Sequence, residues 1–166
     1  MMGAMHRVEQ FWRHSAGRIE RVESDRALEV LGSVLYPAFA ALPRNERRHG
    51  LDVLATVDRL EARPERLLRQ AALLHDLGKA RSGMSVLDRS QAVFLAAVSP
   101  ALLRAYLRLR PGFARRLARY RDHAAVGAQH LRQLGAAELA DIVSEHHARR
   151  PAHPLTVRLQ LADERN

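Results

Sequence analysis

The sequence predicts an all-α protein that folds as a single compact helical bundle. Apolar residues recur at helical spacing along most of the 166 residues, and no segment shows the sustained alternation of β-branched residues that a surface strand would show. A chain of this length, with 47% hydrophobic and 27% charged residues, suits one domain with one core.

The expected helices are separated by Pro, Gly and polar stretches. Leu51, Leu54, Val57 and Leu60 share one helix face, Pro64 suits the first turn of the next helix, and Gly78 suits its C-cap. Residues 81–88 are expected to form a loop. The expected helices cover residues 5–30, 33–42, 48–62, 64–77, 89–98, 100–109, 112–134, 136–147 and 154–163.

Composition limits the chemistry. The absence of cysteine excludes disulfides, thiol catalysis and thiolate metal sites, so a metal would be held by His, Asp or Glu. Such ligands favour Mn, Fe, Mg, Co or Ni over a structural zinc. The N-terminus has no signal-peptide pattern and no apolar run could span a bilayer, so we expect a cytoplasmic protein with no membrane partner.

The charge favours anionic partners. A net charge of +9 and a pI near 11.3 suit nucleotides, phosphate esters or nucleic acid, although a surface that is basic all over explains them equally well. The densest arginine run, residues 104–121, has helical spacing beside leucines and is expected to be a solvated helix face. Nucleic acid is therefore a possible but not a favoured partner, and the oligomeric state is open.

Histidine and aspartate occur where a metal could gather them. The segment AALLHDLGKA ends an apolar helix pattern with His75-Asp76, two groups that are costly to bury without partners. His49 begins the preceding helix, and consecutive helices with a short connection pack antiparallel, which brings His49 beside His75-Asp76. Asp163 lies in LQLAD, another apolar helix pattern, and a buried carboxylate there also needs a partner.

This pattern, His…His-Asp…Asp with the doublet inside LLHDLGK, resembles the HD-domain superfamily of metal-dependent phosphohydrolases. The resemblance covers about residues 45–166 and implies one or two divalent metal ions (Fe, Mn, Co, Ni or Mg) held by His49, His75, Asp76 and Asp163. Residues 45–166 would then be an HD metal-binding helical domain, and residues 1–44 an N-terminal helical segment packed on it.

The resemblance extends to a second set of ligands. HAAVGAQHL is similar to the segment that supplies an extra histidine in dinuclear members, which would be His123, and SEHHARRP to the segment that supplies another, which would be His146. His147 is the alternative, because adjacent helical side chains point about 100° apart. HAAVGA also resembles the bacterial symmetrical dinucleoside-tetraphosphatase branch.

The predicted function is hydrolysis of a phosphoester or phosphoanhydride bond in a phosphorylated small molecule of nucleotide type, by a metal-activated water. Asp76 is the natural bridging ligand, since a carboxylate has two oxygens. The alternative is a non-catalytic or regulatory HD module that binds a nucleotide or nucleic acid.

Three cationic residues could bind substrate. Lys79 is the only lysine among 27 cationic residues, and a compact ammonium suits a narrow place beside a metal, so we expect it to hold the phosphate that is cleaved. Arg149 or Arg150 could clamp a more distant phosphate, or both could be exposed loop charges.

Overall fold

The computed structural model of the protein describes residues 18–166, and over that range it contains α-helices, one 3-10 helix and no strand. The prediction of an all-α fold is confirmed. None of the described helices is long and apolar enough to cross a bilayer. The elements are α2 (Arg21–Ala40), α3 (Arg44–Leu60), α4 (Arg66–Leu74), η1 (Leu77–Ser82), α5 (Val86–Val98), α6 (Pro100–Leu109), α7 (Pro111–Arg121), α8 (His123–Gln133), α9 (Ala137–Ser144) and α10 (Pro154–Asp163).

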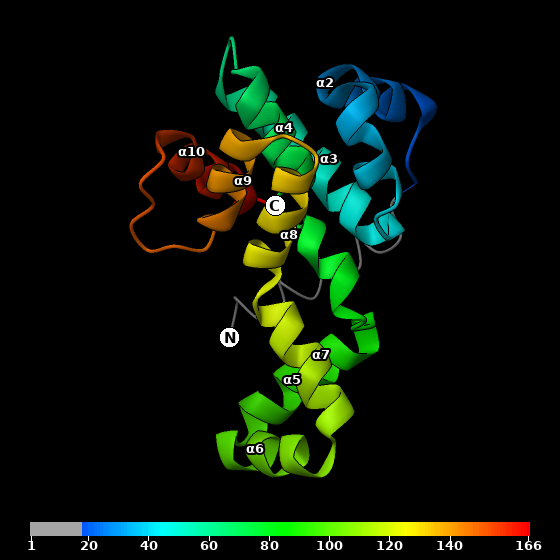
Figure 1. The fold of residues 1–166 in the computed structure, drawn as a ribbon, viewed down its shortest axis with the longest axis vertical. Helices are drawn as coiled ribbons and strands as arrows, with labels where there is room; N and C mark the ends of the chain where they lie inside the picture. Colours follow the sequence, from blue (N-terminus) through cyan, green and yellow to red (C-terminus); the bar gives the residue numbers. More distant parts are fainter. Residues whose placement is uncertain (1–17) are drawn as a thin grey trace.

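The elements form two regions (Figure 1). A main bundle of α2, α3, α4, η1, α8, α9 and α10 holds one continuous apolar core. We call residues 84–122, which contain α5, α6 and α7, the arm, because these helices project away from the bundle. The arm has a small core of its own, centred on Met84, Ala92, Phe113 and Leu117.

The antiparallel pair α3 and α4 is the frame of the bundle. Leu51, Leu54 and Val57 are buried, as their spacing on one helix face predicts. Gly50 lets the two helices approach closely, because a Cβ at this position would lie 3.0 Å from the Leu73 carbonyl oxygen. At the other end of the pair, Arg69 donates to Asp58 at 2.9 Å.

Helix α2 packs on this pair and contributes to the same core. It spans the two helices expected at residues 5–30 and 33–42, and Gly32, with φ 69° and ψ 177°, interrupts the helical backbone between them, close to the break that the sequence predicts. The part of the first expected helix before residue 18 lies outside the described residues. The division between residues 1–44 and 45–166 stays a prediction.

The end of α4 differs from the prediction. The helix begins after Glu65, so Pro64 lies before it, and it ends at Leu74 with His75 as its C-cap. The chain then tightens into η1, which ends at Gly83 with φ 70°. Gly78 is not a C-cap: it lies where η1 crosses α8, and a Cβ there would be 2.0 Å from the His123 carbonyl oxygen. Close backbone packing, rather than a left-handed turn, explains this glycine.

Three other boundaries also differ. The helix expected at residues 112–134 is divided at Asp122 into α7 and α8, because the chain leaves the arm there and enters the bundle. The expected loop at residues 81–88 is shorter, since η1 reaches Ser82 and α5 begins at Val86. Helix α9 ends at Ser144, so the HHARR segment lies in a turn.

Candidate metal centre

The fold brings together seven potential metal ligands that are far apart in the sequence. They lie where α3, the end of α4, the start of α8, the turn after α9 and the end of α10 meet. These residues are His49, His75, Asp76, His123, His146, His147 and Asp163.

One group lies between α3, α4 and α10. The Nε2 atoms of His49 and His75 are 3.2 Å apart. The Asp163 Oδ1 atom lies 3.0 Å from the His49 Nε2 atom and 3.6 Å from the His75 Nε2 atom. Donor atoms of His49, His75 and Asp76 all lie within 4.8 Å of one another, so this group could hold a metal ion.

A second group lies between α8 and the turn after α9. The His123 Nε2 atom is 3.2 Å from the His146 Nε2 atom and 3.1 Å from the His147 Nε2 atom. These three donors also lie within 4.8 Å of one another. Both alternatives for the ligand in SEHHARRP are therefore in the group, with His146 buried and His147 more exposed.

Asp76 lies between the two groups and presents one oxygen to each. Its Oδ2 atom is 3.4 Å from the His75 Nε2 atom, and its Oδ1 atom is 3.3 Å from the His123 Nε2 atom. The Oδ1 atom is buried and has no hydrogen-bond partner among residues 18–166. Buried carboxylate oxygens are rarely left without one, so this orphaned acceptor fits a cation between the groups.

The imidazoles are held with Nε2 toward the centre. In each of three cases the Nδ1–H donates to the backbone carbonyl three residues earlier: His75 to Ala72 at 3.1 Å, His123 to Tyr120 at 2.7 Å, and His146 to Val143 at 2.6 Å. Such bonds fix the ring orientation, and in the neutral imidazole they leave the lone pair on Nε2, where it can bind a metal. No sequence motif marks these carbonyl acceptors, although each lies three residues before a candidate ligand.

Electrostatics favour ionised carboxylates at the centre. Burial would raise the pKa of Asp76, but the charges of His75 and Lys79 hold it well below its usual range. Burial would also raise the pKa of Asp163, but a hydrogen bond from His49 and the charge of His75 outweigh it and lower this pKa to about 2. Both groups are therefore acceptors at neutral pH.

The pKa values of two of the buried histidines shift in opposite directions. Burial and the charge of His75 lower the pKa of His146 to about 3, which keeps its imidazole neutral and able to bind a metal. For His75 burial also lowers the pKa, but Asp76 and Asp163 outweigh it and raise the value to about 9. An imidazolium at His75 thus supplies positive charge that a metal ion could replace.

The cationic residues are distributed unequally. The Lys79 ammonium donates to the Asp76 Oδ2 atom, and its side chain is only 18% exposed. Arg149 lines a cleft of about 330 Å³ beside the second group, together with His146, His147, Ala148, Gln160, Asp163 and Glu164. Arg150 is exposed and is not among the residues that line this cleft.

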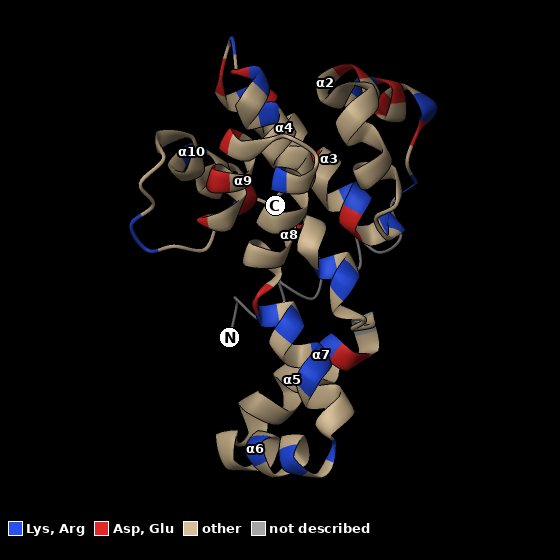
Figure 2. Ribbon diagram, in the orientation of Figure 1, with Lys and Arg blue, Asp and Glu red and all other residues tan. Residues whose placement is uncertain are grey.

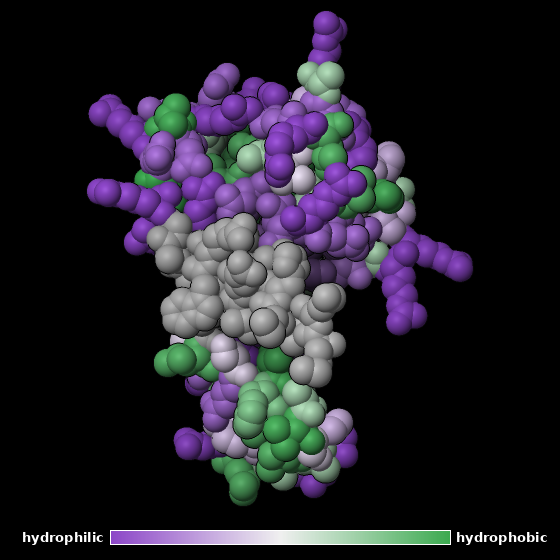
Figure 3. Space-filling model, turned by 180° about the vertical axis from the view of Figure 1, so that it is seen from behind, coloured by the Kyte–Doolittle hydropathy of each residue, from purple (hydrophilic) through white to green (hydrophobic). Residues whose placement is uncertain are grey.

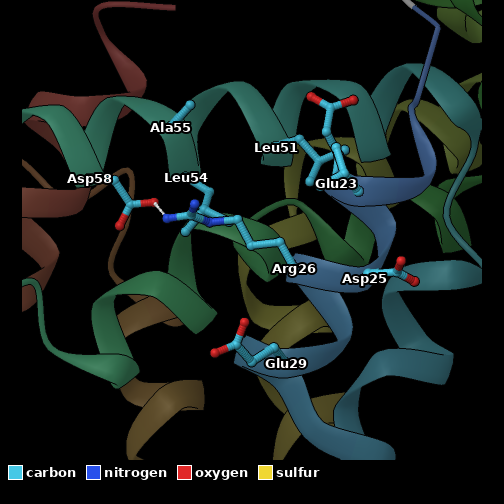
Figure 4. A pocket seen from close by; sticks show the side chains of 9 residues that line it. Glu23, Asp25, Arg26, Glu29, Leu51, Leu54, Ala55 and Asp58 are labelled. Atoms are coloured by element: carbon cyan, nitrogen blue, oxygen red, sulfur yellow. Dashed lines mark hydrogen bonds and ion pairs between the residues drawn. The ribbon is translucent and has the colours of Figure 1, made fainter.

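A roomier groove, of about 640 Å³, lies between α2 and α3 and contains none of the candidate ligands. Figure 4 shows Arg26 crossing it to reach Asp58. Its size therefore does not make it the candidate site, which is chosen by the convergence of donor atoms.

Comparison with known proteins identifies the family. The HD domain matches residues 47–165, which is most of the chain, and the protein belongs to this family. Neither the curated proteins nor the solved structures contain a match to the chain. The resemblance to the HD superfamily is therefore confirmed. The assignment of individual residues as metal ligands or substrate-binding groups stays a prediction.

Proposed function

We propose that the protein is a metal-dependent phosphohydrolase that cleaves a phosphoester or phosphoanhydride bond of a nucleotide-type substrate. The observation that supports this most strongly is the carboxylate of Asp76, which lies between two groups of histidines with one oxygen toward each. This arrangement of donors suits two divalent ions that share one carboxylate.

The proposed ligands divide between the two groups. His49, His75 and Asp163 would hold one ion, and His123 with His146 or His147 would hold the other. Bound divalent ions lower the pKa of a coordinated water and neutralise phosphate oxygens. Imidazole and carboxylate ligands suit Fe, Mn, Co, Ni or Mg, in keeping with a chain that has no cysteine.

The chain's own groups orient the substrate. Lys79 is anchored on Asp76 at the centre, and we propose that its ammonium also binds the phosphate that is cleaved. Arg149 in the cleft is the better candidate of the two arginines for a second phosphate, since a guanidinium can bind two phosphate oxygens at once. A cleft of about 330 Å³ is at the small end of ligand sites.

Within the HD superfamily we propose the branch that resembles bacterial symmetrical dinucleoside tetraphosphatases. The support is the HAAVGAQHL segment, which forms α8 and begins with His123 in the second group. Substrates of this class carry several phosphates between two nucleosides, and Lys79 and Arg149 could bind different phosphates of one molecule.

A nucleotide panel tests this proposal. Mononucleotides and dinucleoside polyphosphates are incubated with the protein and Mn, Fe, Co or Mg, and released phosphate and nucleotides are measured. We expect metal-dependent turnover that Asp76→Ala lowers by about a thousandfold or more, with the fold retained, because the carboxylate that both ions share is removed. Asp141→Asn is the matched control, since this aspartate is exposed and its ion pair with Arg132 lies away from the candidate ligands. Nucleotide binding without turnover for any metal would show a regulatory module instead.

A further inference from the structure

The arm exposes an unusual number of large apolar side chains. Leu87 is 80% exposed, Phe94 66% and Leu109 81%, and Val93, Val98 and Leu102 are also exposed. On α5, Leu87, Phe94 and Val98 are seven and four residues apart and so share one helix face. Figure 3 shows hydrophobic side chains gathered over the arm. Patches of this kind on a protein surface mark interaction sites.

The same region carries most of the net charge. Residues 84–122 contain eight arginines and two aspartates, a net charge of +6 out of +9 for the chain. Arginines dominate the charged residues of α6 and α7 in Figure 2. One of the two aspartates, Asp88, faces Arg116 at 3.5 Å, so little acidic charge is available to neutralise the others. Six of the arginines are exposed: Arg104, Arg108, Arg110, Arg115, Arg119 and Arg121.

The exposed face is not needed to hold the arm together. The inward faces of its helices already pack on one another through Ala92, Phe113 and Leu117. Helix α6 lies at the end of the arm farthest from the bundle, so its exposed Leu102 and Leu109 are accessible to a large partner (Figure 1). Arg104 and Arg108 lie on the same helix but on other faces of it, so the far end of the arm carries both apolar and cationic side chains.

We propose that the arm attaches the protein to the surface of an anionic membrane. Exposed Phe and Leu side chains insert at the boundary between headgroups and acyl chains, while nearby arginines bind lipid phosphates. Both features of the arm are then used. The expectation of no membrane partner rested on the absence of a long apolar run, which bears on spanning a bilayer and not on attachment to its surface.

Two other kinds of partner would each use only one feature of the arm, either its apolar side chains or its arginines. A second copy would cover the apolar face but would bring two arms of charge +6 together, which is repulsive. A nucleic acid would satisfy the arginines, but the Tyr106, Phe113 and Tyr120 rings pack within the arm and offer no set of exposed rings for base stacking.

Vesicle flotation with the full chain tests the proposal. Phosphatidylcholine vesicles with and without phosphatidylglycerol are compared at low and high salt. We expect the protein to float with the anionic vesicles, to bind pure phosphatidylcholine at least about tenfold more weakly, and to lose affinity as salt rises.

Matched variants separate the contribution of the arm from general effects. Phe94→Ser with Leu109→Ser should weaken binding about tenfold or more, whereas Val34→Ser with Val157→Ser, at sites 63% and 53% exposed on α2 and α10, should not. Arg104→Glu with Arg108→Glu should weaken binding similarly, whereas Arg21→Glu with Arg63→Glu, exposed on the main bundle, should not. Circular dichroism and metal content verify that each variant folds.

Several results would overturn the proposal. They include no flotation, equal binding to both vesicle types, or arm variants that bind like their controls. Absence of vesicle binding with a dimer that the serine variants dissociate would assign the face to a second copy. Absence of vesicle binding with RNA binding that only the glutamate variants lose would assign it to nucleic acid.

Discussion

The main bundle and the arm are built from the same residue types and use them differently. In the bundle, Leu68, Leu131 and Leu159 are completely buried. In the arm, Leu87 and Leu109 are about four-fifths exposed, and only a few side chains form a core. The bundle uses apolar burial to fix the positions of polar groups at the candidate metal centre. The arm buries fewer apolar side chains and leaves several of its large ones exposed.

The two regions meet at the edge of the candidate metal centre. Glu46 on α3 is buried and accepts a hydrogen bond from Arg89 on α5 at 2.6 Å. The Arg89 guanidinium lies over the Tyr120 ring, 5.3 Å from its centroid. The Tyr120 carbonyl in turn accepts from His123. A change in the position of the arm would therefore be transmitted through Arg89 and Tyr120 to His123, a candidate metal ligand.

Glycine provides the largest contrast between the regions. Gly78→Ala in the bundle would place a Cβ 2.0 Å from the His123 carbonyl oxygen and 2.8 Å from the Gly127 nitrogen, both backbone atoms. We expect it to lower the free energy of unfolding by about 4 kcal/mol or more and to displace His123. Gly112→Ala in the arm meets nothing within 4 Å and should change it by less than about 1 kcal/mol.

Thermal and denaturant unfolding check this prediction. Equal effects of the two alanine variants would show that the close contact between η1 and α8 does not determine the stability of the bundle.

Core truncation should separate the regions in a hydrogen-exchange experiment. Leu131→Ala removes a completely buried side chain from the bundle and should lower the free energy of unfolding by about 3 kcal/mol, with faster exchange throughout residues 18–166. Phe113→Ala removes the largest side chain of the arm core and should accelerate exchange mainly in α5, α6 and α7. If Phe113→Ala destabilised the bundle amides equally, the arm and the bundle would be one cooperative unit.

Lys79 tests the fine geometry of the centre. Its ammonium donates to Asp76 in a place where the side chain is only 18% exposed, so the broader guanidinium of Lys79→Arg should not fit. We expect about a tenfold to hundredfold loss of kcat/KM with metal content unchanged, and a slightly larger loss for Lys79→Ala. Arg81→Lys, an exposed position in the same 3-10 helix, is the control. Full activity of Lys79→Arg would show that the single lysine is incidental.

The smallest expected effect concerns the ion pair between α2 and α3. Arg48 donates to Glu23 at 2.8 Å and lowers the pKa of this carboxyl below 4.5, its ordinary value, although burial opposes the shift. The pair therefore stabilises the fold fully above about pH 4.5, and this contribution is lost as the pH falls through the lower pKa of the folded state.

Glu23→Gln tests this pair. It should cost about 0.5 kcal/mol at pH 7, and its difference from the unmodified protein should shrink in acid. Denaturant titration at pH 7 and in acid measures this difference in the free energy of unfolding. Glu138→Gln, at an exposed position, is the control. A difference that is independent of pH would contradict the assignment.

Much of the bundle could be predicted from sequence because its helices have clear apolar periodicity. The pairing of His49 with His75 followed from two helices with a short connection, and their Nε2 atoms are 3.2 Å apart. The break at Asp122 could not be predicted in this way. Leu117 in the arm and Ala128 in the bundle are about three helical turns apart, so the pattern continues in phase through the break.

The second group of candidate ligands shows the same limit. Family resemblance, and not local periodicity, indicates His123 and His146, since no helical period brings the start of α8 beside the turn after α9. His146 and His147 both lie in the second group because helix α9 ends at Ser144. In the turn that follows, two adjacent side chains need not point apart as they would on a helix. The tertiary path of the chain determines these positions.

Anomalous diffraction from crystals grown with Mn can show whether Asp76 joins two metal sites. We predict two Mn peaks, one beside each oxygen of Asp76, with the histidines of the two groups around them. Asp76→Ala crystals should lose both peaks. A crystal of the active protein in Mn with no peak beside Asp76 would contradict the account.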